Sequence, residues 1–319
     1  MAKLYLHVGM PKTGTSYIQS LFNLNVNFFH LNHNLGVLSN RFPHQLACSF
    51  INDEHLNVRA DIKNLKEEID LERVKEDVHN LAKRNSAVFC SSEYFILPEK
   101  DLIYNFFKEF FSEIEVIYTV RRQDRLLASG FNQDVKALNR TADLVWSKKD
   151  KTLNYYDNCK EWTELGCEVS LIPYDLVISE DQGLDRAISK ILFGDDRINS
   201  SNLDLPSKKA SNSSLSKQAL FLKLAMNRLG LQNSELLRLF SQKIEESDSV
   251  FELPPVFAKT IMSAYELPNT KLAEEFGDEN LAASLTFTEF CEKDSLGDEV
   301  RWNPLSGVED LISFLCARQ

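Results

Sequence analysis

Short apolar runs recur along the first part of the chain and predict buried strands. Each run is rich in β-branched and aromatic residues and is followed by glycine, by polar residues or by proline. The runs lie at residues 4–8, 87–91, 116–120 and 169–172. We therefore expect four buried strands in the first 200 residues.

Apolar positions at helical spacing separate these runs. Ile18, Leu21 and Phe22 form one face of a helix directly after the first run. Similar spacings predict helices within residues 62–81, 102–110, 123–138 and 155–162, with Asp101 as the cap of the second. Strands that alternate with helices predict an α/β fold with a central parallel sheet flanked by helices.

Two parts of the chain depart from this alternation. Residues 23–57 are polar and rich in histidine and asparagine, with little periodicity, which predicts a long loop of the kind that often serves function. From about residue 200 a polar stretch leads into mainly helical patterns. We expect an α/β core in residues 1–200 and a mainly helical extension, packed on the core, in residues 201–319.

Composition narrows the class of protein. The chain has 319 residues, 43% of them hydrophobic, and a net charge of −11, so it can bury a full core and lacks the basic field that nucleic acid requires. Its six cysteines form no C-x-x-C pair and are expected to be reduced thiols with no zinc site. No apolar run reaches membrane-spanning length and no signal peptide is evident, so we expect a cytoplasmic protein with no transmembrane segment.

Residues 9–16, here called the glycine loop, carry the strongest chemical signal. Their sequence is Gly-Met-Pro-Lys-Thr-Gly-Thr-Ser, which is close to the nucleotide-triphosphate pattern G-x-x-x-x-G-K-[ST]. The pattern requires a lysine directly after the second glycine, where this chain has Thr15, and the lysine is displaced to Lys12. The glycine loop therefore predicts a site for a phosphorylated nucleotide in a protein that is not an ordinary ATPase or GTPase.

The surroundings of the glycine loop support this interpretation. It joins a predicted strand to the start of a predicted helix, where unpaired backbone N–H groups favour an anion. Gly9 and Gly14 permit backbone angles and close approaches that a side chain would obstruct. An ordinary glycine-rich turn is the alternative interpretation.

A second candidate anion site follows from the ends of the strands. Lys12, Glu93 and Arg121 each come shortly after a predicted strand, and ligands of open parallel sheets bind beyond the carboxyl ends of the strands. Arg121 could offer a planar fork to a phosphate, and Ser129, two helical turns later, a hydroxyl donor. The alternative is that Arg121 or its neighbour pairs with Asp124 or Glu93 and only ends a strand.

These two segments resemble the motifs of one family. Residues 10–16 are similar to the 5′-phosphosulfate loop of sulfotransferases that use 3′-phosphoadenosine-5′-phosphosulfate, and residues 121–129 to their 3′-phosphate motif. Residues 36–38, 91–93 and 212–215, with Gln133 and Lys136, extend the resemblance to bacterial, carbohydrate-type members. The resemblance implies a P-loop NTPase-like sulfotransferase fold. It also implies transfer of a sulfuryl group to a hydroxyl or amine of a carbohydrate, a glycolipid or a small metabolite.

The resemblance also implies roles for individual residues. Lys12 would neutralise charge on the leaving phosphate oxygen, and Arg121 and Ser129 would hold the 3′-phosphate. Tyr17 would contact adenine. The 5′-phosphate would be bound by donors of Thr13, Gly14, Thr15 and Ser16. No divalent metal is required, adenosine 3′,5′-bisphosphate is the expected product, and Lys208-Lys209 is interpreted as a solvated pair rather than a cover for the 3′-phosphate.

The acceptor proton needs a base. Glu93 is the first candidate because it closes a predicted strand, and His44 is the second. In the alternative interpretation Glu93 only orients Arg121 or Lys12, and His44 is a surface histidine. A P-loop nucleotide or small-molecule kinase, and a non-catalytic nucleotide-binding protein on the same fold, are the other functions considered. The identity of the acceptor and the oligomeric state are not predicted.

Overall fold

The chain divides into two units, each made of separate segments. The structure, a computed structural model, describes residues 1–38, 42–52, 60–179, 183–194, 203–206, 214–231, 251–287 and 299–302. The first unit comprises Met1–Arg121, Thr152–Ala210 and Pro268–Leu285, and the second Arg122–Lys151, Ser211–Leu267 and Thr286–Gln319. The expected boundary near residue 200 stays a prediction.

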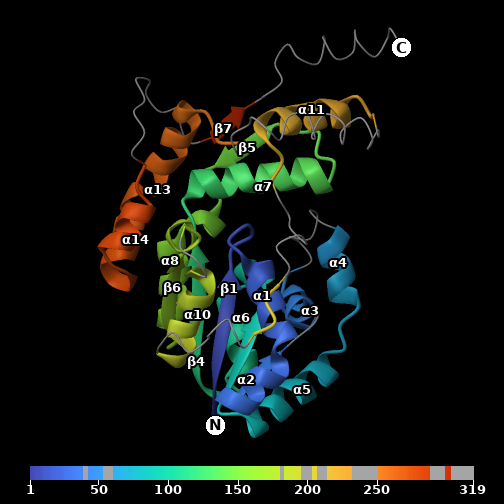
Figure 1. The fold of residues 1–319 in the computed structure, drawn as a ribbon, viewed down its shortest axis with the longest axis vertical. Coiled ribbons are helices and arrows are strands. Elements are labelled where there is room, and N and C mark those ends of the chain that lie inside the picture. Colours follow the sequence, from blue (N-terminus) through green and yellow to red (C-terminus); the bar gives the residue numbers. More distant parts are fainter. Residues whose placement is uncertain are drawn as a thin grey trace. The chain divides into compact units, whose positions relative to one another are not determined.

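A five-stranded parallel sheet forms the centre of the first unit (Figure 1). Its strands are β1 (Ala2–Gly9), β2 (Leu35–Leu38), β3 (Ala87–Ser91), β4 (Phe111–Val120) and β6 (Glu168–Pro173). The strand order is β2-β3-β1-β4-β6, so β1 lies in the middle, between β3 and β4. The four predicted strands are confirmed, as is the α/β class with its central parallel sheet.

Helices flank this sheet, as the alternating pattern predicted. Those of the first unit are α1 (Thr15–Leu24), α2 (Val26–His33), α3 (Phe42–Ser49), α4 (Ala60–Glu67), α5 (Leu71–Arg84), α6 (Lys100–Phe107), α8 (Tyr155–Glu164), α9 (Tyr174–Val177), α10 (Gly183–Phe193) and α14 (Glu279–Ser284). A core cluster joins α1, α2 and α10 to one face of the sheet, with Phe22 stacked on Phe89 at 3.9 Å between ring centroids. On the opposite face, Tyr118 of β4 is fully buried beside α8, close to Cys159 and Trp162.

The expectation of a long loop across residues 23–57 is wrong for the described part of that stretch. It holds α2, the short strand β2 and α3. The sequence of α2 has a weak helical pattern, and its stability comes from packing, since Phe29 is fully buried and stacks on Phe22 at 4.5 Å between centroids. At four residues β2 is too short for its pattern to stand out.

The start of α6 also differs from the prediction. Its N-cap is Glu99, two residues before the expected Asp101, and the cap makes no side-chain hydrogen bond. Asp101 lies inside the first turn, where its Oδ1 accepts a hydrogen bond from the N–H of Leu102 at 2.9 Å. An acidic residue in the first turn favours the helix through the dipole without being its cap.

The second unit contains helices and a small sheet. Its elements include α7 (Gln123–Ala137), β5 (Leu144–Ser147), α11 (Lys217–Arg228) and β7 (Glu299–Trp302), and α13 (Pro255–Phe276) contributes residues to both units. β5 and β7 pair antiparallel. Asn132 of α7 holds Leu215, just before α11, because its side chain forms two hydrogen bonds with the backbone of Leu215, of 2.8 and 3.0 Å. The described residues after 201 are mainly helical, as expected.

Two features bear on the expectations from composition. Within the described ranges, no helix combines the length and apolar character needed to cross a bilayer. The four described cysteines, Cys48, Cys90, Cys159 and Cys167, are buried free thiols. Burial raises the pKa of Cys159 and Cys167 to about 12, which keeps both thiols protonated. Cys291 and Cys316 lie outside the described residues.

Candidate functional site

The glycine loop joins the carboxyl end of β1 to the start of α1. Two of its residues have left-handed backbone angles, Lys12 with φ 66° and Gly14 with φ 79°. Gly14 is the N-cap of α1, and no side chain caps this helix. The N-terminal N–H groups of α1 are thus not capped by a side chain, which is the arrangement that binds an anion.

The two threonines of the glycine loop brace it from within. The hydroxyls of Thr13 and Thr15 both donate to the carbonyl oxygen of Met10, at 2.5 and 3.2 Å, and both side chains are buried. Their hydroxyl protons are therefore used inside the loop in this structure. Ser16, in the first turn of α1, is exposed, and its hydroxyl and the backbone N–H groups are the donors that best suit a ligand phosphate.

Both glycines of the loop are required by close contacts. A Cβ atom on Gly9 would collide with Oγ1 of Thr15. A Cβ atom on Gly14 would lie 2.7 Å from Cδ2 of Leu184 and 3.1 Å from Cε2 of Tyr174. The loop thus packs tightly against α1 on one side and against α9 and α10 on the other.

A buried polar layer lies on three neighbouring strands, close to the carboxyl end of β1. It consists of His7, Ser91 and Thr119, on β1, β3 and β4, and is named the polar layer below. Nδ1 of His7 lies 2.8 Å from Oγ of Ser91, and Nε2 lies 2.9 Å from Oγ1 of Thr119. Burial lowers the pKa of His7 to about 3, so its ring is neutral and uses both nitrogens in hydrogen bonds.

The neutral state of His7 predicts an acid-sensitive fold. An unfolded chain binds a proton on this histidine below pH 6.5, and the folded chain does so only below about pH 3, so stability falls as pH falls through this window. Between pH 7.5 and 5 we expect His7 to account for a loss of about 2 kcal/mol in the free energy of unfolding. Urea denaturation at both values will measure it, and His7→Gln should flatten the dependence.

His79→Gln is the matched control for this prediction, because it removes an exposed histidine outside the polar layer. It should keep the pH dependence of the wild type. An equal dependence in wild type and His7→Gln would contradict the assignment to His7, whatever the absolute stability of the variant.

Arg121 follows β4 directly and contacts the glycine loop. Its Nη1 donates to the carbonyl oxygen of Lys12 at 3.2 Å, and its Nε donates to Oδ1 of Asp175 at 3.0 Å. The guanidinium lies over the ring of Tyr174, 5.1 Å from its centroid. The hydroxyl of Tyr155 donates to the carbonyl oxygen of Arg121 at 2.8 Å. Arg121 therefore lies beside the backbone of Lys12.

The two adjacent arginines have different partners. Arg122 forms a bidentate pair with Asp124, with distances of 2.7 and 2.8 Å, which is the strand-ending arrangement considered from the sequence. Arg121 pairs with Asp175 instead of Asp124 or Glu93. Two of the five N–H donors of Arg121 are used in its bonds to Asp175 and to Lys12, which leaves donors for a ligand.

Tyr174 and Asp175 belong to this site and were not found from the sequence. They come directly after Pro173, the last residue of β6. The rule that selected Glu93 and Arg121, a polar residue shortly after a predicted strand, applies to them equally. The signal was therefore present at the end of the fourth predicted strand.

The structure brings the two candidate bases together. Glu93 begins the short 3-10 helix η2 (Glu93–Ile96) after β3, and its Oε2 lies 3.9 Å from Nδ1 of His44 on α3. Nδ1 of His44 lies 2.7 Å from Oγ of Ser92. Gln19 of α1 donates to Oε2 of Glu93 at 3.4 Å, which links this pair to the helix of the glycine loop.

The environment of His44 affects its protonation. Burial lowers its pKa, and the neighbouring carboxylate of Glu93 acts in the opposite direction. A His44 ring kept neutral near physiological pH can accept a proton, and the carboxylate would stabilise the charge that results. Glu93 and His44 thus supply the carboxylate and the imidazole that a proton-accepting site requires.

Tyr17 and Ser129 complete the set of residues predicted for the nucleotide, and their contacts with it stay predictions. Tyr17 packs against the core cluster of α1, α2 and α10, and its hydroxyl donates to Oδ2 of Asp185 at 3.0 Å. Burial and the Asp185 carboxylate raise the pKa of Tyr17. Ser129 lies half-buried on α7 of the second unit, and its pairing with Arg121 stays a prediction. Lys208 and Lys209 lie outside the described residues.

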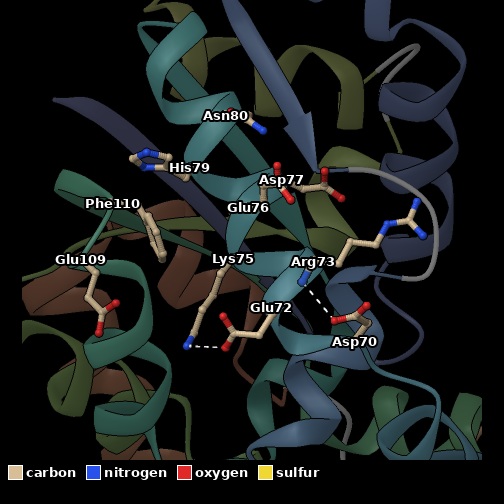
Figure 2. Close-up of a pocket in the computed structure, with 10 residues that line it drawn as sticks. All are labelled: Asp70, Glu72, Arg73, Lys75, Glu76, Asp77, His79, Asn80, Glu109 and Phe110. Atoms are coloured by element: carbon tan, nitrogen blue, oxygen red, sulfur yellow. Dashed lines mark hydrogen bonds and ion pairs between the residues drawn. The ribbon is translucent and has the colours of Figure 1, made fainter.

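A surface hollow lies along α5, and none of the predicted site residues line it (Figure 2). Lys75 and Glu72 form an ion pair of 3.1 Å there, and Asp70 caps α5 through the N–H of Arg73. The other lining residues are Glu76, Asp77, His79, Asn80, Glu109 and Phe110. Mixed charges of this kind are typical of a solvated helix face. Over the described part of the chain, no three His, Cys, Asp or Glu side chains are grouped as ligands for a metal ion.

No protein-family model matches the chain, and no curated protein sequence matches it either.

Proposed function

We propose that the chain is a sulfotransferase that uses 3′-phosphoadenosine-5′-phosphosulfate and acts on a hydroxyl or amine acceptor. One observation carries the proposal. The glycine loop has the left-handed backbone and the uncapped helix of an anion cradle, and Arg121 contacts it. Its lysine is at Lys12 instead of the position after Gly14, which suits a nucleotide without the β- and γ-phosphates of ATP.

The proposed fold is the P-loop NTPase-like fold of the sulfotransferases. In support, β1 lies at the centre of the parallel sheet, and its carboxyl end leads through the glycine loop to a helix that starts without a side-chain cap. Ligands of such sheets bind beyond the carboxyl ends of the strands. The glycine loop, Glu93, Arg121 and Asp175 all follow strands at that edge.

In the proposed reaction, the main tasks of the protein are to position the donor and the acceptor and to stabilise the charge that develops. The acceptor oxygen or nitrogen attacks sulfur in line, the bond from sulfur to the phosphate oxygen breaks, and adenosine 3′,5′-bisphosphate leaves. Lys12 would neutralise the charge that develops on the leaving phosphate oxygen. Arg121 would use its remaining N–H donors for the 3′-phosphate.

Glu93 and His44 would act together on the acceptor. Either Glu93 takes the proton from the acceptor itself, or His44 takes it and the Glu93 carboxylate, 3.9 Å away, stabilises the resulting positive charge. A carbohydrate, a glycolipid or a small metabolite is the proposed class of acceptor, as the resemblance to carbohydrate-type members implies.

Calorimetry with three nucleotides tests the proposal. Adenosine 3′,5′-bisphosphate should bind at least about tenfold more tightly than adenosine 5′-monophosphate, because Arg121 would add charge-assisted hydrogen bonds to the 3′-phosphate, each worth about 1.5–3 kcal/mol. It should also bind more tightly than ATP with magnesium. Equal or tighter binding of ATP with magnesium would reject the proposal and favour a kinase.

A non-catalytic nucleotide-binding protein requires a different test. The purified protein can be incubated with labelled donor and a panel of sugar, glycolipid and phenol acceptors. Transfer to at least one acceptor is expected. Tight binding of the donor without transfer to any of them would favour a binding protein.

A further inference from the structure

The backbone of Lys12 has an unusual conformation. Its φ of 66° lies in the left-handed region, which is strained for an L-residue with a Cβ atom. Gly14 can adopt φ 79° without this strain, but Lys12 cannot. Contacts from the rest of the fold must therefore hold Lys12 in place.

The pair formed by Arg121 and Asp175 supplies such a contact. Arg121 donates to the carbonyl oxygen of Lys12 with one guanidinium nitrogen and to the Asp175 carboxylate with another, at 3.2 and 3.0 Å. The side chains are 18% and 10% exposed, so solvent screens their attraction only in part. Tyr174 lies against the flat face of the guanidinium, which limits its rotation.

We propose that Asp175 is a positioning residue for the glycine loop. Its carboxylate orients the Arg121 guanidinium, which in turn holds the Lys12 carbonyl and fixes the left-handed turn from which the anion-binding N–H groups follow. The identity of the anion rests on the proposed function. The effect on the backbone of the loop does not.

The charge of Asp175 and its positioning role predict opposite effects on anion affinity when Asp175 is replaced. A carboxylate near an anion site repels the anion, so from charge alone Asp175→Asn should tighten binding. If Asp175 positions the loop, the same change should weaken binding, because Arg121 loses its anchor and Lys12 can relax to a right-handed or extended backbone. The sign of the change in affinity therefore separates the two roles.

Asp175→Asn and Glu168→Gln form a matched pair of variants. Glu168 starts the same strand, β6, and pairs with Lys3 at 3.0 Å, at the end of the strand opposite to Asp175. For Asp175→Asn we expect the Kd for adenosine 3′,5′-bisphosphate to rise about tenfold, as for the loss of one charge-assisted hydrogen bond. Hydrogen exchange of the amides in residues 10–15 should quicken by about tenfold. Glu168→Gln should leave both the Kd and the exchange rates within about twofold of wild type.

Three results would overturn the proposal. The first is tighter or unchanged binding of adenosine 3′,5′-bisphosphate by Asp175→Asn. The second is unchanged hydrogen exchange in residues 10–15 of that variant. The third is an effect of Glu168→Gln as large as that of Asp175→Asn. If wild type fails to bind adenosine 3′,5′-bisphosphate, the proposed function fails, and the exchange comparison still decides the role of Asp175.

Two further variants guard against a misfolded Asp175→Asn. Arg121→Lys keeps the charge but lacks the fork needed to contact Asp175 and Lys12 together, so it should quicken exchange of the loop as much as Asp175→Asn. Asp175→Glu keeps the carboxylate and should restore exchange to within about threefold of wild type. Wild-type exchange in Arg121→Lys would contradict the proposal on its own.

Discussion

Lys12→Ala is expected to lower the rate of sulfuryl transfer by about 1,000-fold, which corresponds to about 4 kcal/mol of lost transition-state stabilisation. The reason is the charge that develops on the leaving phosphate oxygen, which Lys12 would neutralise at the glycine loop. The stability of the fold should change little. Alanine also carries a Cβ atom, so it bears the same cost of the left-handed backbone as lysine.

Transfer of labelled sulfate to whichever acceptor the panel identifies will measure this effect. Lys63→Ala is the control, since it removes an exposed lysine of α4 that pairs with Glu67 of the same helix at 3.7 Å. Circular dichroism and urea denaturation will show whether the variants remain folded. Full activity in a folded Lys12→Ala variant would remove the lysine from the mechanism.

Gly14→Ala should destabilise the fold by about 3 kcal/mol and abolish nucleotide binding. About 1–2 kcal/mol comes from the left-handed backbone, and the rest from the contact of the new methyl group with Leu184 and Tyr174. The loss of binding follows because Gly14 is the N-cap that sets the first N–H groups of α1.

Gly166→Ala separates the two contributions. Gly166 has a φ of 88°, and a Cβ atom there meets nothing within 4 Å. It should cost only the backbone term, about 1–2 kcal/mol, and leave nucleotide binding unchanged. Urea denaturation and calorimetry on both variants will decide this, and equal losses of stability would show that the packing around Gly14 is not tight.

The strands and the glycine loop could be predicted because their signals are local. Residues 87–90 form an apolar run that ends at Ser91, and the observed strand β3 has the predicted bounds 87–91. The displaced lysine and the spacing of the glycines are also visible within eight residues. The position of Arg121 after β4 placed it at the correct edge of the sheet without any knowledge of its partners.

The partners could not be predicted because they are distant in sequence. His7 bonds to residues 84 and 112 positions away, and nothing in a strand pattern marks one histidine as buried between two hydroxyls. Tyr17 bonds to Asp185, 168 positions away, so its place in the core was not visible either. β2 was missed since four residues at the edge of a sheet give almost no periodicity.

The uncharged ring in the polar layer has a consequence for enzymology. Because burial holds the pKa of His7 at about 3, the polar layer carries the same charge in mildly acidic and in neutral buffer. A titration step in activity between pH 5 and 8 would therefore come from groups other than His7.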